Sequence, residues 1–265
     1  MPYVESSGAR IYWEERGSGE PLLMIMGLGY SLEMWGRVVP RLAEHYRVIV
    51  FDNRGVGRSD VPPGPYSIAG MAADAETVMR AAGLERAHVL GVSMGGMIAQ
   101  EFTLAYPERV HSLVLGCTAF GGPHAVSARP LVIAILFARA TMGAEQAIQA
   151  MVPYIYDAGT PRERIEEDLA LRRQTLPTAE GYLAQVKAVM SWSSYDRLPE
   201  ISAPTLVIHG ATDELVPPQN GKLIAERIAG AELVILPSAS HIYFTDQPEA
   251  SMNATLTFLR RHPLS

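Results

Sequence analysis

Hydrophobic runs and amphipathic stretches alternate along the first part of the chain. Residues 9–15 (A-R-I-Y-W-E-E) form an amphipathic stretch that predicts a strand, paired with a short strand near Tyr3. Continuous apolar runs predict strands buried on both faces, at residues 21–26, 46–51, 87–92 and 110–115. Residues 71–82 and 94–106 are typical of helices. Strands separated by helices form βαβ units, so we predict an α/β fold with a mostly parallel sheet.

The strand pattern is interrupted in the middle of the chain. Helix-like stretches follow one another there, at residues 131–142, 144–154, 161–174 and 178–192. The alternation then resumes, with strands at 204–209 and 231–236 and helices at 218–229 and 248–261. We therefore expect a discontinuous core of residues 1–118 and 202–265, interrupted by an inserted helical cap at residues 119–201.

Composition and charge narrow the class of protein. Of the 265 residues, 48% are hydrophobic, which argues against a disordered chain. The net charge of −6 and the lack of a Lys/Arg run argue against a nucleic-acid partner. The apolar run at residues 131–138 is too short to cross a membrane, and no targeting pattern is present, so we expect no membrane partner and a cytoplasmic location. Cys117 is the only cysteine, which excludes a disulfide framework and a multi-cysteine zinc site.

Ser93 lies in the sequence Gly91-Val92-Ser93-Met94-Gly95, between a predicted strand and a predicted helix. A sharp strand-to-helix turn needs glycine on both sides, because a Cβ would clash where the chain doubles back. Such a turn raises the serine hydroxyl above the sheet edge, next to the N–H groups that open the helix. We interpret Ser93 as a nucleophile; the alternative is a glycine-rich turn with an incidental serine.

A serine hydroxyl needs a base to take its proton. His241 follows the predicted strand at 231–236, so it lies at the same carboxyl edge of the sheet as Ser93. His209 lies inside an apolar strand and is interpreted as a core or near-site histidine. We therefore predict that His241 is the base.

The base needs an acid that holds its ring in the correct tautomer. Asp213 comes three residues after the end of a predicted strand, at the edge that also carries the serine and the histidine. The adjacent Glu214 is its competitor, and Asp196 lies within the exit of the helical insertion. We predict Asp213 as the acid.

An oxyanion hole needs two N–H donors. We expect one from Met94, the residue after the nucleophile. The other is expected from the glycine-containing loop at residues 27–30, where we favour Leu28. A glycine-rich loop without a catalytic purpose is the alternative.

These residues together resemble the α/β-hydrolase superfamily with a helical cap, over essentially the whole chain. The marks are the motif around Ser93, residues 51–60 (F-D-N-R-G-V-G-R-S-D), residues 203–210 (A-P-T-L-V-I-H-G) leading to Asp213, and His241. The resemblance implies an eight-stranded, mostly parallel sheet flanked by helices, and a triad in the order serine, acid, histidine. Epoxide hydrolases and haloalkane dehalogenases have aspartate at the nucleophile position, so the serine argues against both. Val92 and Ile242 stand where carbon–carbon bond hydrolases often have Asn and Trp.

The resemblance leaves esterases, lactonases and perhydrolases open. We expect a serine hydrolase that cleaves ester or lactone bonds of small to medium, mostly apolar molecules, without a cofactor or a metal. A slow-turnover ligand receptor of the same fold, a perhydrolase and a carbon–carbon bond hydrolase are the alternatives. The oligomeric state is left open.

The substrate pocket is predicted from flexible and aromatic side chains near the site loops. Twelve methionines suit an adaptable apolar pocket, although ordinary core filling explains them equally. The candidate pocket residues are Tyr30, Met142, Trp192 and Ile242. No cluster of basic residues adjoins the site loops to suggest a charged substrate.

Overall fold

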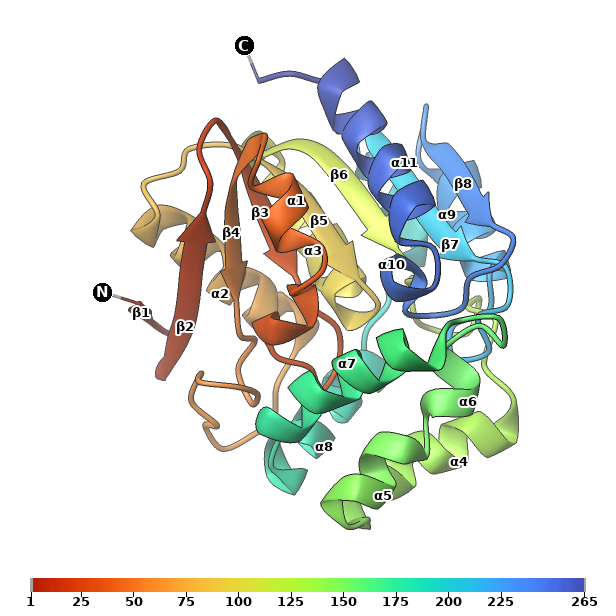
Figure 1. Ribbon diagram of the computed structural model, residues 1–265. Coiled ribbons are helices and arrows are strands. Elements are labelled where there is room, and N and C mark those ends of the chain that lie inside the picture. The colour runs from red at the N-terminus through yellow and green to blue at the C-terminus, as the bar shows by residue number, and fades with distance from the viewer. Residues whose placement is uncertain (1, 265) are drawn as a thin grey trace.

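A computed structural model describes residues 2–264 and shows an eight-stranded sheet (Figure 1). The strands lie in the order β1-β2-β4-β3-β5-β6-β7-β8. Strands β1 and β2 are antiparallel to their neighbours, and β3 to β8 pair in parallel. The bounds are β1 Tyr3–Ser6, β2 Ala9–Arg16, β3 Glu20–Ile25, β4 Tyr46–Phe51, β5 Ala87–Val92, β6 Val110–Gly116, β7 Thr205–Gly210 and β8 Glu232–Leu236. The predicted fold class is confirmed.

The sheet separates two hydrophobic cores, because successive side chains of a strand point to opposite faces. In β3, Leu23 and Ile25 join one core and Leu22 and Met24 join the other. The first face is covered by α2 (Ile68–Ala81), α3 (Met94–Ala105) and α9 (Gln219–Arg227). The second is covered by η1 (Leu32–Trp35), α1 (Val39–Leu42), α10 (Tyr243–Asp246) and α11 (Pro248–Arg261). Burial on both faces explains why these strands are continuous apolar runs in the sequence.

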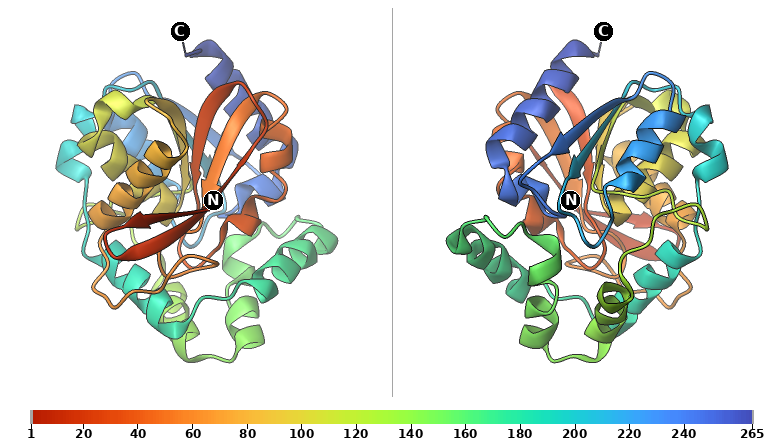
Figure 2. Two further views of the ribbon diagram at one scale, coloured as in Figure 1. Left: turned by 90° about the vertical axis from the view of Figure 1, so that its left-hand side faces the viewer. Right: turned by 90° about the vertical axis from the view of Figure 1, so that its right-hand side faces the viewer.

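The segment between β6 and β7 is helical and gathers at the end of the sheet toward which β3 to β8 run (Figures 1 and 2). Its elements are α4 (Pro130–Ala138), η3 (Arg139–Thr141), α5 (Ala144–Gln149), α6 (Val152–Ile155), α7 (Arg162–Gln174), α8 (Ala179–Met190) and η4 (Tyr195–Glu200). The division into core and cap at residues 119–201 stays a prediction. No helix within residues 2–264 combines the length and the hydrophobicity that crossing a bilayer requires.

The prediction of a single helix at residues 144–154 was wrong. Residues 144–154 form two short helices, α5 and α6, rather than one. Pro153 has no N–H, and its ring would clash with the carbonyl of Gln149 in a continuous helix, so α5 ends there. Ile148, in α5, and Met151, between the two helices, are both buried.

The start of α3 is pressed against the sheet. A Cβ added to Gly95 would lie 2.1 Å from the Ile25 carbonyl oxygen, and one added to Gly91 would lie 2.2 Å from the Gly95 oxygen. No side chain fits at either position, because real Cβ atoms do not come so close to backbone oxygens. Glycine therefore sets how closely α3 approaches β3 and β5, and with it the position of Ser93.

We predict that Gly95→Ala lowers the free energy of unfolding by about 1–3 kcal/mol or more, because an added methyl group overpacks this crossing. Urea denaturation measures the change. Gly143→Ala is the matched control, since an added Cβ there meets nothing within 4 Å, and its effect is expected within about 0.5 kcal/mol. Equal stability of the two variants would contradict the close packing.

Candidate active site

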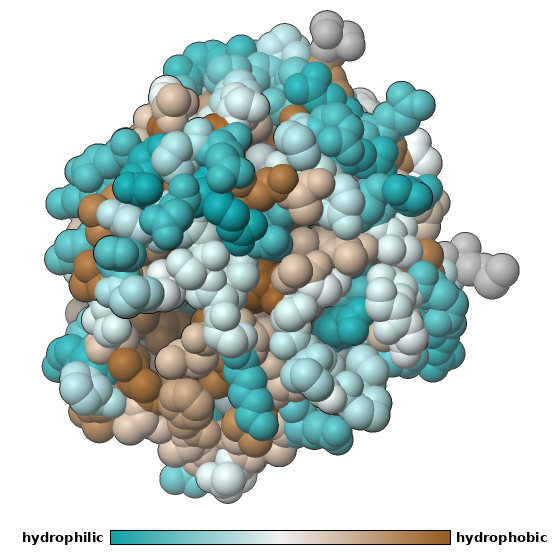
Figure 3. Space-filling model, turned by 180° about the vertical axis from the view of Figure 1, so that it is seen from behind, coloured by the Kyte–Doolittle hydropathy of each residue, from teal (hydrophilic) through white to brown (hydrophobic). Residues whose placement is uncertain are grey.

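The main cavity lies between the loops at the carboxyl edge of the sheet and the inserted helices. Its volume is about 310 Å³, which suits a small organic molecule. Ser93 and His241 both line it, as do Leu28 and Met94. Most of the wall is apolar, from Met97, Ala119, Ile133, Leu136, Phe137, Met151, Ile155 and Val189 among others. Hydrophobic side chains also gather on the surface over this helical part of the molecule (Figure 3), where Val126, Leu131, Phe137 and Met190 are exposed.

Ser93 stands on a strained turn between β5 and α3. Its backbone has φ 58° and ψ −123°, a conformation that residues with a side chain rarely adopt. Hydrogen bonds on both sides hold it: the Ser93 N–H donates to the Gly116 oxygen at 2.9 Å, and the Ser93 oxygen accepts from Thr118 Oγ1 at 2.7 Å. The Gly96 N–H also donates to the Ser93 oxygen, at 2.9 Å. The turn is therefore kept by the sheet and by the next loop.

Asp213 and His241 form a buried hydrogen-bonded pair. Their Oδ2 and Nδ1 atoms are 2.8 Å apart, and both side chains are almost fully buried. The other carboxylate oxygen of Asp213 accepts from the N–H groups of Leu215 and Val216, at 2.9 and 2.8 Å. A carboxylate at Nδ1 selects the tautomer with its proton there, so Nε2 of His241 carries the lone pair. The pair can accept a proton from a hydroxyl group in the cavity.

His209 makes a contact with Asp213 that the sequence did not indicate. Its Nε2 lies 2.8 Å from the Val216 oxygen and 3.4 Å from Asp213 Oδ2. Burial alone would raise the pKa of Asp213, but the imidazoles of His241 and His209 outweigh it and lower the pKa to about 2. Two imidazoles therefore keep this carboxylate ionised. The four-residue spacing between His209 and Asp213 across the end of β7 is the signal that could have found the contact.

The loop after β3 faces the nucleophile. A Cβ on Gly27 would lie only 3.1 Å from Ser93 Cβ, so the bare backbone adjoins the serine. The Gly29 N–H donates to Gln185 Oε1 at 2.9 Å, and Gln185 Nε2 donates to the Arg54 oxygen at 2.8 Å. Gln185 on α8 thus ties the inserted helices to this loop, a role that its sequence position did not suggest.

The backbone near Ser93 offers two free donors. Within residues 2–264, neither the Leu28 N–H nor the Met94 N–H has a hydrogen-bond acceptor. Both residues line the cavity. One unpaired N–H at the start of α3 and another in the loop after β3, both beside a serine, are the arrangement that stabilises an oxyanion.

Of the four predicted pocket residues, one lines the cavity and three lie elsewhere. Tyr30 lines it. Met142 follows a turn after α4 and faces a separate cavity, together with Leu176 and Pro177. The indole N–H of Trp192 donates to Glu101 at 2.7 Å, which directs the ring away. Ile242 is buried in the core under the sheet edge, and its N–H donates to the Ile155 oxygen at 2.9 Å.

Methionines do form part of the cavity wall, as the composition suggested. Met94 and Met97 come from α3, and Met151 and Met190 come from the inserted helices. Flexible thioethers adapt to ligands of different shape.

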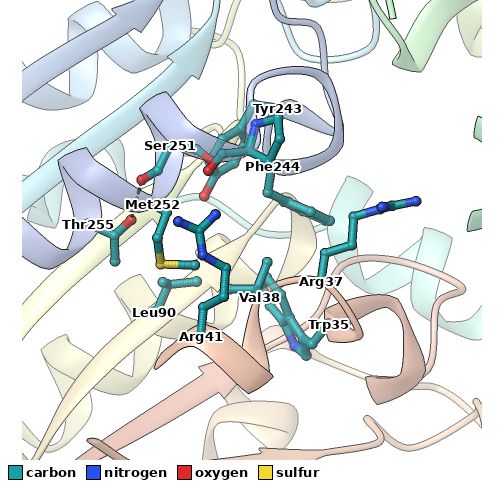
Figure 4. Close-up of a pocket in the computed structure, with 11 residues that line it drawn as sticks. Trp35, Arg37, Val38, Arg41, Leu90, Tyr243, Phe244, Ser251, Met252 and Thr255 are labelled. Atoms are coloured by element: carbon teal, nitrogen blue, oxygen red, sulfur yellow. Dashed lines mark hydrogen bonds between the residues drawn. The ribbon is translucent and has the colours of Figure 1, made fainter. Parts of the chain in front are cut away.

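A second cavity is too small for a substrate. It lies between Trp35, Val38 and Arg41 on one side and Phe244 and Met252 on the other (Figure 4). Its volume of about 20 Å³ holds one water molecule at most.

One cluster within residues 2–264 has side-chain atoms that could bind a metal ion. These atoms belong to Cys117, His209 and Asp213 and lie within 4.8 Å of one another. Hydrogen bonds occupy these atoms, since Cys117 Sγ accepts from the Gly210 N–H at 3.4 Å and Asp213 binds His241. Burial raises the pKa of the Cys117 thiol well above its usual range, so the thiol is uncharged. The cluster is a poor metal ligand set.

The lowered pKa of Asp213 has a consequence for stability. Because this pKa is lower in the folded chain than the usual value of about 3.9, the ionised carboxylate stabilises the fold above about pH 4, and the effect is lost as the pH falls toward 2. We predict that the unfolding free energy of the wild type minus that of Asp213→Asn decreases by about 2 kcal/mol over that interval.

Urea denaturation at a series of pH values measures this difference. The other carboxyl groups are common to both proteins and cancel. A difference that stays constant or increases as the pH falls from 4 to 2 would show that the pKa of Asp213 is not lowered.

Known proteins that are similar to this chain include hydrolases of the same fold. The RutD protein of Azorhizobium caulinodans, assigned as a carbamate hydrolase, is 31% identical over 261 residues, 97% of this chain and 98% of that protein. The 3-oxoadipate enol-lactonase 2 of Acinetobacter baylyi is 30% identical and covers 91% of this chain, which covers 88% of it. The crystal structure of the enol-lactonase from Burkholderia xenovorans superposes with a TM-score of 0.88 at 28% identity, over 98% of this chain and 100% of that one.

The family model for the alpha/beta hydrolase fold matches residues 20–139, from the start of β3 to the first residue of η3. The relatives extend the match over nearly the whole chain, including β7 and β8 and the loops after them, which contain Asp213 and His241. The chain therefore belongs to the α/β hydrolase fold family and is a hydrolase.

Proposed function

We propose that the chain is a serine hydrolase that cleaves carboxylic ester or lactone bonds of small molecules without a cofactor. The observation that carries the proposal is the shared cavity. Ser93, on its strained turn, and His241, bound to the ionised Asp213, line the same cavity of about 310 Å³. A weakly nucleophilic hydroxyl beside an oriented imidazole is the combination that acyl transfer requires.

In the first half of the proposed reaction, Ser93 Oγ attacks the carbonyl carbon and His241 Nε2 takes the hydroxyl proton. The carbonyl oxygen becomes an oxyanion, which accepts hydrogen bonds from the N–H groups of Leu28 and Met94. The carbon–oxygen bond to the alcohol then breaks, and the leaving oxygen takes the proton from His241. The product is an ester between the acyl group and Ser93.

In the second half, His241 takes a proton from water, whose oxygen attacks the acyl carbon. The bond to Ser93 Oγ breaks, and the serine recovers its proton from His241. One ester and one water thus give one carboxylic acid and one alcohol. For a lactone, both groups stay on one molecule, a hydroxy acid.

Asp213 acts through His241. Its charge stabilises the imidazolium that forms each time the ring is protonated, and its hydrogen bond to Nδ1 keeps Nε2 directed to the cavity. The enol-lactonases among the relatives and neighbours support an ester bond as the target, since an enol-lactone is a cyclic ester. We keep the cytoplasm as the expected location, where a lone buried thiol such as Cys117 stays reduced.

We predict that Ser93→Ala lowers kcat for p-nitrophenyl ester hydrolysis at least about 10³-fold, because no other group in the cavity replaces the nucleophile. Circular dichroism and Tm are expected to match the wild type. Ser191→Ala, which changes an exposed serine at the end of α8, is the matched control and is expected to retain full activity.

Full activity of Ser93→Ala would contradict the nucleophile. Tight binding of an ester by the wild type without turnover would instead favour a receptor of the same fold.

A further inference from the structure

Two buried arginines stand beside the substrate cavity. Arg139, in η3, is 8% exposed, and Arg172, in the last turn of α7, is 3% exposed. Both guanidinium groups lie over the ring of Tyr30, 6.0 and 4.9 Å from its centre. Tyr30 and Arg139 line the cavity that contains Ser93. Positive charge therefore adjoins a wall that is otherwise mostly apolar.

Neither arginine forms an ion pair with a carboxylate among residues 2–264. Both terminal nitrogens of Arg172 lack a hydrogen-bond partner among residues 2–264. Arg139 donates to the Ala147 oxygen at 3.1 Å and to the Tyr182 hydroxyl at 3.4 Å, and both acceptors are uncharged. Buried charged groups in proteins are normally paired, so this pair is an exception that needs a reason.

The neighbouring carboxylates are bound to other groups. Glu145 pairs with Arg173 at 2.8 Å. Asp168 accepts from Arg37 at 3.2 Å, and its other oxygen accepts from Tyr156 and Thr245. Among residues 2–264, neither carboxylate accepts a hydrogen bond from Arg139 or Arg172.

Stacking on aromatic rings offsets only part of the cost of burying the two guanidinium charges. Arg139 lies 5.0 Å from the centre of the Tyr182 ring as well as over Tyr30. The faces of these rings attract the cations but offer no acceptor in the plane of the guanidinium N–H groups. A planar carboxylate provides two such acceptors, and its binding to arginine is stronger than a neutral hydrogen bond.

We propose that Arg139 and Arg172 form an anion subsite, and that the preferred substrates are esters or lactones with a free carboxylate away from the bond that is cleaved. Arg139 makes the direct contact from the cavity wall, and Arg172 adds a second charge on the same tyrosine. The inference rests on the proposed serine hydrolase function and deepens it. It adds a carboxylate to the mostly apolar substrate that the sequence predicts, because neither arginine adjoins the site loops in sequence.

The kinetic test compares two ester series of matched length. The first contains the monomethyl esters of succinate, glutarate, adipate and pimelate, and the second contains the methyl esters of the corresponding unbranched monocarboxylic acids. For at least one length, kcat/KM of the wild type is expected to be about tenfold or more higher for the anionic ester, in line with a charge-assisted hydrogen bond. A preference for the neutral ester at every length would overturn the proposal.

Variants of the two arginines test whether they cause the preference for the anionic ester. Arg139→Gln and Arg172→Gln are expected to lower the anionic-to-neutral ratio of kcat/KM about tenfold. Arg162→Gln, at the start of α7 with a 66% exposed side chain, is the matched control and is expected to leave the ratio unchanged. An equal effect of all three variants on both ester series would assign the arginines a packing role and overturn the proposal.

A binding measurement separates this inference from the proposed chemistry, because it needs no turnover. Succinate, glutarate, adipate or pimelate is expected to raise the Tm of Ser93→Ala, and the corresponding diamides are not. The shift is expected to disappear when Arg139→Gln is added. Dicarboxylate binding without ester hydrolysis by the wild type would contradict the serine hydrolase but support the anion subsite. Ester hydrolysis with equal binding of dicarboxylate and diamide would support the serine hydrolase but contradict the anion subsite.

Stability without ligand gives an independent check. Replacing an unpaired buried charge with an apolar side chain of similar size removes the cost of keeping that charge away from water. Arg172→Met is therefore expected to keep or raise the Tm of the unliganded protein while the dicarboxylate shift decreases. A lower Tm with an unchanged dicarboxylate shift would show that Arg172 is structural.

Discussion

The left-handed backbone of Ser93 can exist only because glycines surround it, and the arrangement of the site depends on this turn. A φ of 58° is unfavourable for a residue with a side chain, so neighbouring contacts must hold it. Gly95 lets α3 touch the Ile25 carbonyl, and Gly27 brings the next loop to within contact distance of the serine. The same crowding that strains the turn places two unpaired N–H groups and a hydroxyl in one small space. Strain and proposed chemistry therefore share one structural cause.

Parallel strand order brings the other groups to this turn. Residues 28, 93, 213 and 241 are far apart in sequence but follow the carboxyl ends of β3, β5, β7 and β8, which lie at one edge of the sheet. The inserted helices leave the sheet after β6 and return before β7, so they cover that edge. Gln185 bonds them to the loop after β3. The scaffold thus supplies the reactive groups, and the inserted helices supply much of the apolar wall and the two unpaired arginines.

Sequence reasoning succeeded where local pattern and fold rules act together. The strands at 46–51 and 87–92 have the predicted bounds, because strands buried on both faces are continuous apolar runs between turns. Asp213 and His241 lie in hydrogen-bonding contact, as strand order at a shared edge suggested. The inserted helices were harder, since their packing depends on contacts between distant residues. Trp192 turns to Glu101, and Met142 faces another cavity. Only the three-dimensional structure shows that, among residues 2–264, Arg139 and Arg172 have no acidic partner.

The central claim is that Ser93 becomes covalently bonded to the acyl carbon of the substrate. Intact-protein mass spectrometry after reaction with an alkyl fluorophosphonate, followed by peptide mapping, tests it most directly. One adduct per chain on the peptide that contains Ser93, formed in parallel with the loss of ester hydrolysis, is the expected result. An unmodified Ser93 in a protein whose activity has been lost, or full ester hydrolysis by a protein modified at Ser93, would contradict the account.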